Sequence, residues 1–574
     1  MYICGMYIQY CSSKQNGKTY TYPLLCKKYR ESGKIKTEVI ANLTRFPKEV
    51  IMAIEGALKN KQDVLVSLKD IVFKSSIDYG FVFVLLTIMQ RLRITEVLEK
   101  IFGERTNIVQ LMIIGKIVTR GSKLCIFNWI KRNQVVANKL GIDLSKLKLE
   151  TIYEVLGDLS YLQNKIERKW NIYHKVEKDE VYLYDITSSY FEGAQNALAA
   201  FGYNRDGKKG KMQIVVGLIT NKDGFPLSIE VFEGNENDYK TVISQLQKIK
   251  NDFAVSNVIF VGDRGMRIRY NLEQMNAEDR QGVEYITALS IEEIRCLINE
   301  DAIQLDLFSK DLAEIEGDGV RYVLCNNPEL EKEHSQTRTS LKTKFEEALH
   351  EIKLSYDTRQ HNNNLNKARL AQGDKNKKLV IQFSEKQIDS YKYRVRKIAE
   401  KYHMQSFYQV AITPEMFSVE FNFEKYTQAK QLDGKYVIVT SIPKEKMSKE
   451  CVRQEYKNLK YVEHAFRDMK TTQLDVRPVF HVKENTTRGH VFVTMFAYSI
   501  VRELENRIFP WLKLNNVSKN EKLSLQDIEE ELKMIKLNVL QIKKHHQEIK
   551  ITELTNRQKE IFMKLEIKPE LMLV

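Results

Sequence analysis

An abrupt change of hydrophobic pattern at residue 181 constrains the fold more than any other feature of this sequence. Residues 78–175 carry apolar side chains at helical spacing, whereas β-branched and aromatic runs follow them. The runs VYLYDITSSYFEG, KMQIVVGLIT and FPLSIEVFEG predict three strands, and the turn at 221–224 predicts that the last two form a hairpin. A helix capped at Asn237 and Asp238, the strand NVIFVGDRG, another helix and VEYITALS follow. This order predicts a mixed α/β domain.

Three antiparallel strands that run into αβ units are the order of the ribonuclease-H-like α/β fold. The first and fourth strands are neighbours in such a sheet. Beyond residue 291 the sequence is polar and rich in lysine until GKYVIVTSIP, which again predicts a strand. We therefore expect an insertion between the last core strand and the acidic helix KEKMSKECVRQEYKNLKYVEHAFRDMKT.

The full chain has 574 residues, which is enough for three or four domains. A hairpin around residues 31–34 predicts a small β unit near the start of the chain. The expected organisation is a small β/helix unit at 1–75, a helical DNA-binding domain at 76–175, a catalytic core at 178–290 and 431–505, an insertion at 291–430 and a C-terminal helical region at 506–574.

The charge balance favours a nucleic-acid partner. Lysine and arginine number 90 and aspartate and glutamate 75, so the net charge is +15, and 28 tyrosines and 25 phenylalanines accompany it. A lysine-rich cytoplasmic enzyme fits this balance less well but is not excluded. Seven cysteines without a CxxC pair argue against a disulfide framework and a zinc knuckle. The apolar runs are shorter than the ~20 residues of a membrane helix, so we expect a soluble, intracellular protein without a membrane partner.

Two aspartates occupy positions where carboxylates have a functional meaning. Asp185 lies in the middle of an apolar strand, where an ionised carboxylate is costly unless it is paired or bound to a metal. Asp263 ends the strand VIFVG, and functional groups gather at the carboxyl ends of strands in open α/β sheets. Alone, Asp185 could equally be an aspartate that hydrogen-bonds a neighbouring serine or threonine, and Asp263 would more often be a turn residue or a helix cap. Adjacent strands would bring them together, which favours a joint site.

A third carboxylate, Glu463, lies in the predicted helix KEKMSKECVRQEYKNLKYVEHAFRDMKT. Tyr456, Glu463 and Lys470 are each seven residues apart and would stack along one face of that helix. Lys460 and Arg467 fall near the same stripe. Without the two aspartates, an ordinary salt-bridged amphipathic helix would be the preferred explanation of this pattern.

Two aspartates and a glutamate are oxygen ligands of the kind that Mg²⁺ and Mn²⁺ prefer. Two such ions ~3.5–4 Å apart can activate a nucleophile and stabilise the leaving oxygen of a phosphodiester. The predicted reaction is phosphoryl transfer on nucleic acid. Four further acids come second as candidates for this site, namely Asp206, Asp223, Glu284 and Asp475.

The motifs together resemble the DDE transposases of bacterial insertion sequences, in the branch with a Y-x2-R-x3-E-x6-K signature. This chain has Tyr456, Glu463 and Lys470 at the signature spacing but Leu459 at the arginine position. The segments YLYDITSSYFEG, VIFVGDRGM, RPVFH and RGHVFVTMFAY also resemble that family. The likeness extends over nearly the whole chain to about residue 500.

The resemblance implies a cut-and-paste enzyme with a ribonuclease-H-like core. Asp185, Asp263 and Glu463 would hold two Mg²⁺ ions, which Mn²⁺ could replace. Tyr456 and Lys470 would contact DNA phosphates, and Lys460 or Arg467 could supply the cation that Leu459 lacks. The expected partners are terminal inverted repeats and target DNA as double strands, and a second copy of the chain in the synaptic complex.

Two alternatives stay open at this point. One is a ribonuclease-H-like nuclease without strand transfer, and the other is a catalytically inactive or domesticated DNA-binding protein. The resemblance places the protein in the bacterial cytoplasm, associated with the nucleoid.

Overall fold

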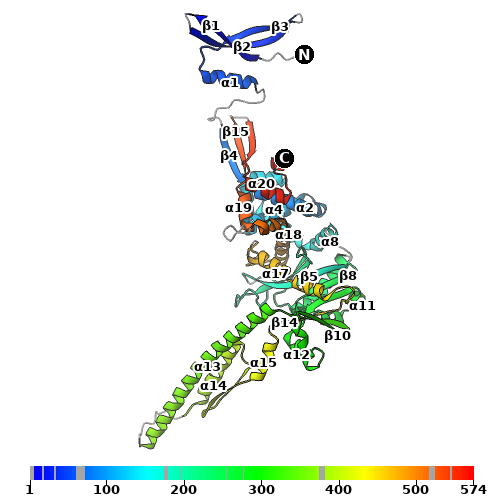
Figure 1. The fold of residues 1–574 in the computed structure, drawn as a ribbon, viewed down its shortest axis with the longest axis vertical. Helices are drawn as coiled ribbons and strands as arrows, with labels where there is room; N and C mark the ends of the chain where they lie inside the picture. The colour runs from blue at the N-terminus through cyan, green and yellow to red at the C-terminus, as the bar shows by residue number, and fades with distance from the viewer. Residues whose placement is uncertain are drawn as a thin grey trace. The chain divides into compact units, whose positions relative to one another are not determined.

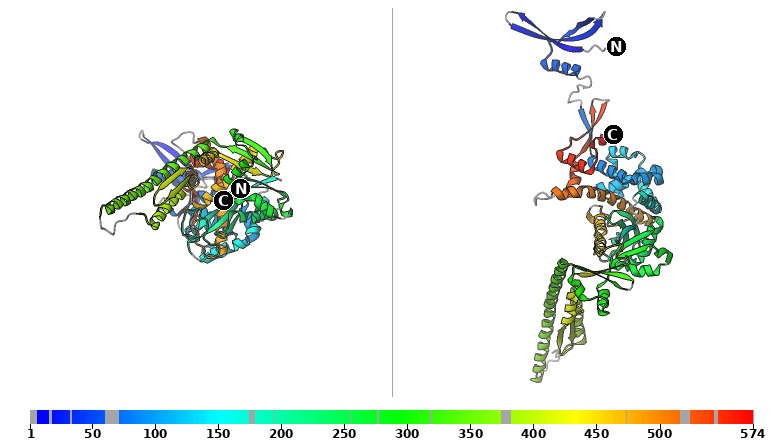
Figure 2. Two further views of the ribbon diagram at one scale, coloured as in Figure 1. Left: turned by 90° about the horizontal axis from the view of Figure 1, so that it is seen from below. Right: turned by 45° about the vertical axis from the view of Figure 1, so that its right-hand side comes forward.

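The computed structural model divides into two compact units, residues 1–85 with 507–574 and residues 86–506 (Figures 1 and 2). We describe each unit by itself. Helices α2 (Gly80–Arg91) and α18 (Glu484–Asn515) have residues in both. The structure describes residues 6–15, 18–31, 34–59, 71–173, 179–193, 195–253, 255–275, 277–317, 319–373, 382–472, 474–515, 524–542 and 546–573.

The first unit joins segments from both ends of the sequence. An antiparallel sheet of β1 (Met6–Gln15), β2 (Lys18–Glu31) and β3 (Lys34–Asn42) precedes α1 (Lys48–Lys59), as the hairpin around 31–34 predicted. A second sheet pairs β4 (Ile71–Asp78) with β15 (Lys536–Ile542), which also pairs with β16 (His546–Ile551). Helices α19 (Leu525–Lys533) and α20 (Asn556–Leu565) and the short helix η6 (Pro569–Leu573) complete the unit. The C-terminal region is therefore not wholly helical, which corrects the sequence-based expectation.

A helical segment opens the second unit, as the spacing of apolar residues predicted. Its buried side chains include Ile114, Leu156 and Trp170, whose indole N–H donates to the Leu92 carbonyl at 2.9 Å. Ser122 caps α5 by accepting from the Cys125 N–H. The helices of this segment are α3 (Ile94–Phe102), η2 (Gly103–Arg105), α4 (Thr106–Thr119), α5 (Lys123–Lys131), α6 (Gln134–Lys139), α7 (Leu149–Tyr161) and α8 (Gln163–Tyr173).

An eight-stranded sheet with the order β10-β11-β14-β9-β8-β5-β6-β7 forms the centre of the second unit. The three strands predicted first are antiparallel, and β8 and β9 are parallel to β5, so the first and fourth strands are neighbours as predicted. The strands are β5 (Asp179–Tyr190), β6 (Gln213–Asn221), β7 (Pro226–Phe232), β8 (Asn257–Gly262), β9 (Val283–Ala288), β10 (Leu312–Gly317), β11 (Val320–Asn326) and β14 (Lys435–Thr440).

The two faces of this sheet carry different helices. Tyr182, Tyr184 and Ile186 of β5 share a hydrophobic core with Val242 and Leu246 of α9. Because successive side chains of a strand point to opposite faces, Asp185 lies on the other face. The connecting helices are α9 (Asp238–Asp252), η3 (Arg264–Met266), α10 (Ile268–Gln274), α11 (Ala277–Arg280), α12 (Ile291–Asn299) and η4 (Leu305–Ser309).

The insertion is shorter than the predicted range of 291–430. Residues 312–326 form β10 and β11, which extend the central sheet, and β14 returns to that sheet after the insertion. The insertion therefore lies between β11 and β14 and not after the last core strand. It comprises α13 (Pro328–Ala371), α14 (Glu385–Tyr402), β12 (Tyr408–Ile412), β13 (Phe417–Phe421) and α15 (Phe423–Gln431).

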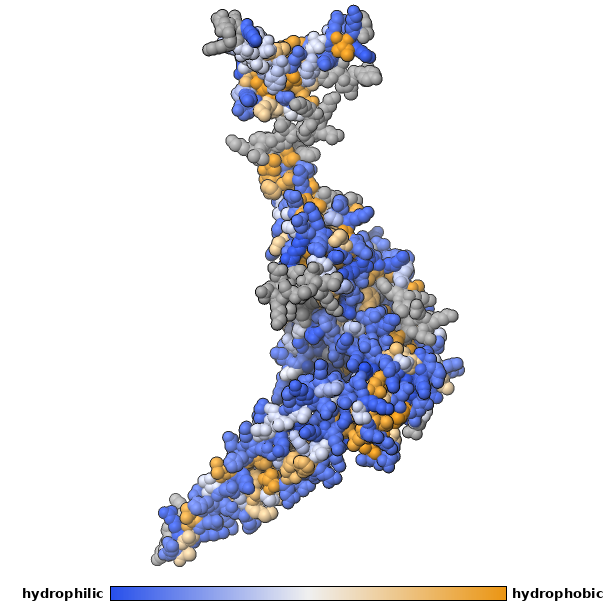
Figure 3. Space-filling model, in the orientation of Figure 1, coloured by the Kyte–Doolittle hydropathy of each residue, from blue (hydrophilic) through white to orange (hydrophobic). Residues whose placement is uncertain are grey.

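The insertion has a hydrophobic core of its own. Figures 1 and 2 show α13 and α14 side by side, and Tyr356 of α13 stacks on Phe383 with ring centroids 4.7 Å apart. Phe345, Tyr391 and Phe417 are buried in the same cluster. Hydrophilic residues cover most of the face of the insertion that Figure 3 shows. Such a core allows the insertion to keep its shape outside the central sheet.

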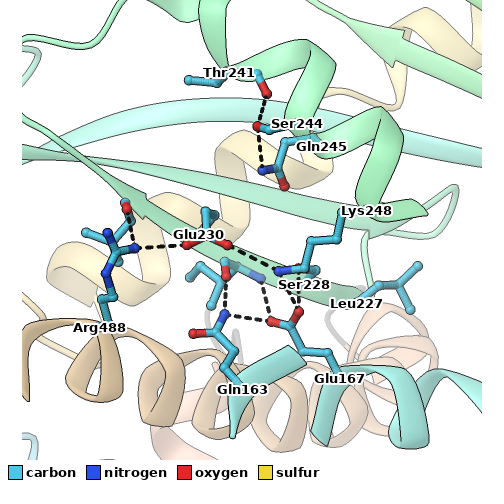
Figure 4. Close-up of polar contacts among 12 residues, drawn as sticks. Gln163, Glu167, Leu227, Ser228, Glu230, Thr241, Ser244, Gln245, Lys248 and Arg488 are labelled. Carbon is cyan, nitrogen blue, oxygen red and sulfur yellow. Dashed lines mark hydrogen bonds and ion pairs between the residues drawn. The ribbon is translucent and has the colours of Figure 1, made fainter. Parts of the chain in front are cut away.

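A buried ionic network joins the helical segment to the sheet (Figure 4). Glu167 of α8 is fully buried and lies 2.8 Å from the ammonium of Lys248 on α9. Lys248 also contacts Glu230 of β7, which pairs with Arg488 of α18. The Glu167 carboxylate additionally accepts from the Ser228 hydroxyl and the Gln163 amide. These contacts connect four elements across the unit.

Within the described residues, no helix is long and apolar enough to cross a membrane.

Candidate active site

Asp185 and Asp263 lie beside one another, as the predicted strand order requires. In the parallel pairing of β5 and β8, Tyr184 stands opposite Gly262, and the two aspartates are the next residues on each strand. Asp263 is exposed and caps η3, where its carboxylate accepts from the Arg264 N–H at 2.6 Å. Asp185 is half-buried and accepts from the Ile186 N–H at 2.8 Å.

Glu463 comes from a helix that packs over the same strand. The predicted single helix is instead divided into α16 (Lys449–Lys457) and α17 (Lys460–Arg467), followed by a π-helical turn, η5 (Asp468–Thr472). Val462, Ala465 and Phe466 are buried and α17 lies against β5, so Glu463 is left exposed on the opposite stripe. Tyr456, Glu463 and Lys470 consequently belong to three different elements and do not stack on one helix.

Asp185 responds to its burial and to the charges of the other two acids. Burial, and then the charges of Asp263 and Glu463, raise the pKa of Asp185 to about 7, although the Ile186 N–H and Arg205 oppose this shift. A carboxyl group that resists ionisation beside two other carboxylates is a group that a cation would stabilise. The structure thus brings together the three acids that the sequence singled out.

Tyr456 lies close to all three acids. Burial raises the pKa of its phenol, and the charges of Asp263, Glu463 and Asp185 add to this shift, while Arg264 opposes it. The hydroxyl therefore stays protonated and can donate a hydrogen bond. Leu459, in contrast, is 8% exposed at the junction of α16 and α17 and belongs to the packed side. The side chain at the signature arginine position does not reach the surface here.

Lys460 and Arg467 are exposed on α17, three residues before and four residues after Glu463. This spacing puts both cations on the Glu463 face. Lys470 is different because it is already paired: its ammonium lies 2.9 Å from the carboxylate of Asp206, which is 1% exposed and also pairs with Arg477. A contact of Lys470 with a phosphate would be shared with Asp206.

The other acids considered in the sequence have local roles. Asp223 lies in the turn between β6 and β7, as expected, and Glu284 pairs with Lys446 at 2.7 Å. Asp206 has a larger structural role than the sequence indicates, because its ion pairs connect the π-helical turn to the loop after β5. The basic stretch NRDGKKGK at 204–211 was the signal in the sequence that could have drawn attention to this loop.

A second group of ligand atoms lies on the far side of α17. Within the described parts of the chain, His464, Asp468 and Glu505 are the group whose three ligand atoms lie within 4.8 Å of one another. His464 already pairs with Asp468 at 2.9 Å, and Glu505 pairs with Arg502 at 3.5 Å. His464 Nδ1 and Asp468 Oδ2 are nevertheless buried without a hydrogen-bond partner among the described residues, so these contacts do not fully satisfy the group.

Asp185, Asp263 and Glu463 fit divalent cations by their chemistry. They offer oxygen atoms only, which suits Mg²⁺ or Mn²⁺, and burial together with the charges of Asp263 and Glu463 raises the pKa of Asp185.

Comparison with known protein families identifies the family of this chain. The family described as "Transposase DDE domain" matches residues 177–500, more than half of the chain, and that range includes Asp185, Asp263 and Glu463. The chain belongs to the DDE transposases. Residues 8–65 match the "IS1634 family transposase, N-terminal domain". DDE transposases are phosphoryl-transfer enzymes, and the enzyme class predicted from the sequence is confirmed.

The search of curated proteins found no match. Among solved structures, a piggyBac transposase synaptic complex with hairpin DNA is similar at a TM-score of 0.31 and 8% identity, over 80% of this chain and 70% of that one. At this level the likeness is weak, and the family assignment rests on the sequence match over residues 177–500.

Proposed function

We propose that this transposase binds the terminal inverted repeats of its element and catalyses metal-dependent strand cleavage and strand transfer by a cut-and-paste route. Asp185, Asp263 and Glu463 would hold two Mg²⁺ ions, or Mn²⁺, in a ribonuclease-H-like core. The observation that carries this proposal is the convergence of three carboxylates: Asp185 and Asp263 follow paired positions of β5 and β8, and Glu463 lies on α17, which packs on β5.

The protein's own groups would prepare the DNA for reaction. Tyr456 would donate its phenolic hydrogen to a phosphate beside the acids, because burial and negative charge keep that phenol protonated. Lys460 and Arg467 would hold neighbouring phosphates from the exposed face of α17. Bound Mg²⁺ would supply the activation of the attacking hydroxyl and the stabilisation of the leaving oxygen.

The domain roles belong to the same proposal. The N-terminal unit and the helical segment would recognise the terminal repeats, and the insertion would contact DNA. Two copies of the chain would act on paired ends inside a bacterial cell. Because phosphate contacts dominate such binding, affinity for DNA should fall steeply as salt rises.

A cleavage and strand-transfer assay tests the proposal. The full chain is mixed with linear DNA that carries the flanking repeats of its own gene, in Mg²⁺ or in EDTA. We expect Mg²⁺-dependent nicking at the repeat end followed by joined products, both lost in Asp263→Asn. Asp306→Asn, which removes an exposed acid away from the site, is the matched control and should react normally.

Other outcomes would select another function. Nicking without joined products would show a nuclease that lacks strand transfer. Specific binding of the repeats without cleavage in either Mg²⁺ or Mn²⁺ would show a catalytically inactive DNA-binding protein.

A further inference from the structure

A cavity of about 850 Å³ lies within the second unit, between the helical segment and the stretch that follows the acidic helix. Residues of α4, α5 and α7 line one side, and residues 475–490 line the other. Gly157 and Asn485 meet at its wall, where a Cβ on Gly157 would lie 2.7 Å from the Asn485 amide nitrogen. The volume is in the range of ~300–1,000 Å³ that binding sites for small ligands occupy.

Lys123 is buried at this cavity with little compensation for its charge. It is 2% exposed, and its ammonium lies 2.7 Å from His490 Nδ1. The other ring nitrogen of His490 faces the Val476 carbonyl at 3.5 Å, which places the ring hydrogen there and makes Nδ1 the acceptor. An ammonium has three donors, and this is the one hydrogen bond of Lys123 within the described residues.

A second buried lysine repels the first. Lys116 is also 2% exposed, and its ammonium donates to the Asp475 carbonyl at 3.2 Å. Burial and the charge of Lys116 together lower the pKa of Lys123 well below its usual value. In the described part of the chain, no carboxylate forms an ion pair with either lysine.

The other residues that line the cavity differ in how deeply they are buried. The acids Glu150, Glu154 and Asp475 are exposed, so they lie near the mouth, and Asp158 is already paired with Arg105. His481 and His490 lie with ring centroids 4.8 Å apart, and burial lowers the pKa of both, so they stay neutral. The N-terminus of α5 adds the positive end of a helix dipole beside Lys123. Deep in the cavity no carboxylate pairs directly with the two lysines in the described residues, although the charge of Asp475 opposes the lowering of the Lys116 pKa by burial.

The chain also offers flat apolar groups at the same cavity. Tyr153 lies with its ring centroid 6.1 Å from that of His481, and both residues line the cavity together with Phe480, which is 66% exposed. Aromatic rings of this kind stack on nucleic-acid bases. Arg477 lines the cavity and also pairs with the Asp206 carboxylate. The same carboxylate pairs with Lys470 of the π-helical turn η5, so Arg477 lies between the cavity and that turn.

We propose that this cavity binds a nucleotide of a DNA strand, with its phosphate on Lys123 and Lys116 and its base against Tyr153 and His481. The phosphate would supply the direct ionic partner that neither buried lysine has among the described residues. The inference rests on the proposed function for its ligand, DNA, but is independent of the three acids and of their metal ions.

The test measures DNA binding in EDTA, where no cleavage occurs. Lys123→Met removes the ammonium and keeps the length of the side chain. We expect its affinity for the linear duplex with flanking repeats to fall by about ten- to a hundred-fold, the range for a charge-assisted hydrogen bond. Lys146→Met, which removes a surface lysine that is 85% exposed, should change affinity less than about twofold. Because binding is measured in EDTA, the result does not depend on the metal ions of the catalytic proposal.

Thermal unfolding without DNA separates a binding role from a structural one. If Lys123 serves a ligand, Lys123→Met should unfold at the same or a higher temperature than wild type, because the buried ammonium is gone. A lower unfolding temperature together with unchanged DNA affinity would overturn the proposal.

Tyr153→Glu tests the cavity without changing the buried lysines. The added negative charge at the lining should weaken DNA binding at least tenfold relative to Tyr153→Phe, and equal binding by the two variants would overturn the proposal. Inorganic phosphate is the third probe. If phosphate raises the unfolding temperature in a Lys123-dependent way while duplex binding is independent of Lys123, the cavity takes a free anion and the assignment to DNA is wrong.

Discussion

At the scale of single residues, the three acids of this transposase differ in their surroundings. Asp185 is half-buried in a central strand, whereas Asp263 and Glu463 are exposed at the ends or outer faces of their elements. Asp185 lies in the middle of an apolar strand, and this burial makes its carboxyl group costly to ionise. The cost of ionising Asp185 should therefore be measurable as a change in the stability of the protein.

Asp185→Asn should stabilise the protein without metal while it abolishes cleavage. The folded pKa of about 7 lies above the unfolded value near 4, so the penalty for ionising Asp185 grows as pH rises from about 4 and is complete above about 7. We expect the variant to unfold at least about 2–4 °C higher at pH 8 and equally at pH 4, by calorimetry. Mg²⁺ should stabilise the wild type at pH 8 but not the variant. A variant that is less stable at pH 8 would contradict this account.

Leu459→Arg should not restore a phosphate contact. Leu459 is 8% exposed against the packed side of the junction between α16 and α17, and an arginine there would bury a charge or displace the junction. We expect a loss of about 1–3 kcal/mol in urea unfolding and no gain in DNA affinity. Leu459→Met, which keeps an apolar side chain, is the control and should lose less than about 1.5 kcal/mol. Unchanged stability with tighter DNA binding would show that the side chain reaches solvent.

At the scale of elements, polar contacts join segments that hydrophobic patterns treat as separate. The division of the acidic helix at residues 458–459 turns α17 so that its apolar side meets β5 and Glu463 faces outward. The ionic network of Figure 4 joins α8, β7, α9 and α18, and so fixes the helical segment on the core.

Lys248→Met should weaken that network strongly. Lys248 is 7% exposed, and its loss leaves the fully buried Glu167 without a cation. We expect the free energy of unfolding to fall by about 3 kcal/mol, measured in urea. Adding Glu167→Gln to Lys248→Met should recover part of this loss, because the uncompensated carboxylate is then removed. Lys240→Met, on the exposed side of the same helix, should cost less than about 1 kcal/mol. Additive losses in the double variant would argue against a buried ion pair.

At the scale of the whole molecule, the ends of the described chain form one unit. β4 pairs along its length with β15, and the Tyr79 and Gly80 N–H groups donate to the Ile535 carbonyl. Ile77 and Tyr79 are buried by this arrangement. The N-terminal unit therefore depends on residues more than 450 positions away in the sequence.

Removal of residues 516–574 should unfold the β4 region without disturbing the central sheet. Hydrogen exchange should show loss of protection in residues 71–79, because β4 loses its partner strand, while β5 and β8 stay protected. The full chain measured under the same conditions is the control. Retained protection at β4 would mean that this strand does not depend on β15.

The sequence alone determined the chemistry and the local elements, because both follow from short-range patterns. Alternation of side chains identified β5, β6 and β7, the turn at 221–224 joined two of them, and the order of elements placed Asp185 beside Asp263. The motif spacing also pointed to Glu463 and to the DDE family, and the comparisons confirm the family.

Only the tertiary structure decided what depends on distant partners. β10 and β11 join the central sheet, β4 pairs with β15, and the acidic helix is divided where Leu459 enters the packed side. Lys123 and His490 meet across 367 residues, and neither carries a signal in its local sequence. Strand pairing and burial depend on which surfaces meet in three dimensions. The hydrophobic periodicity of one segment does not indicate which other segment it packs against.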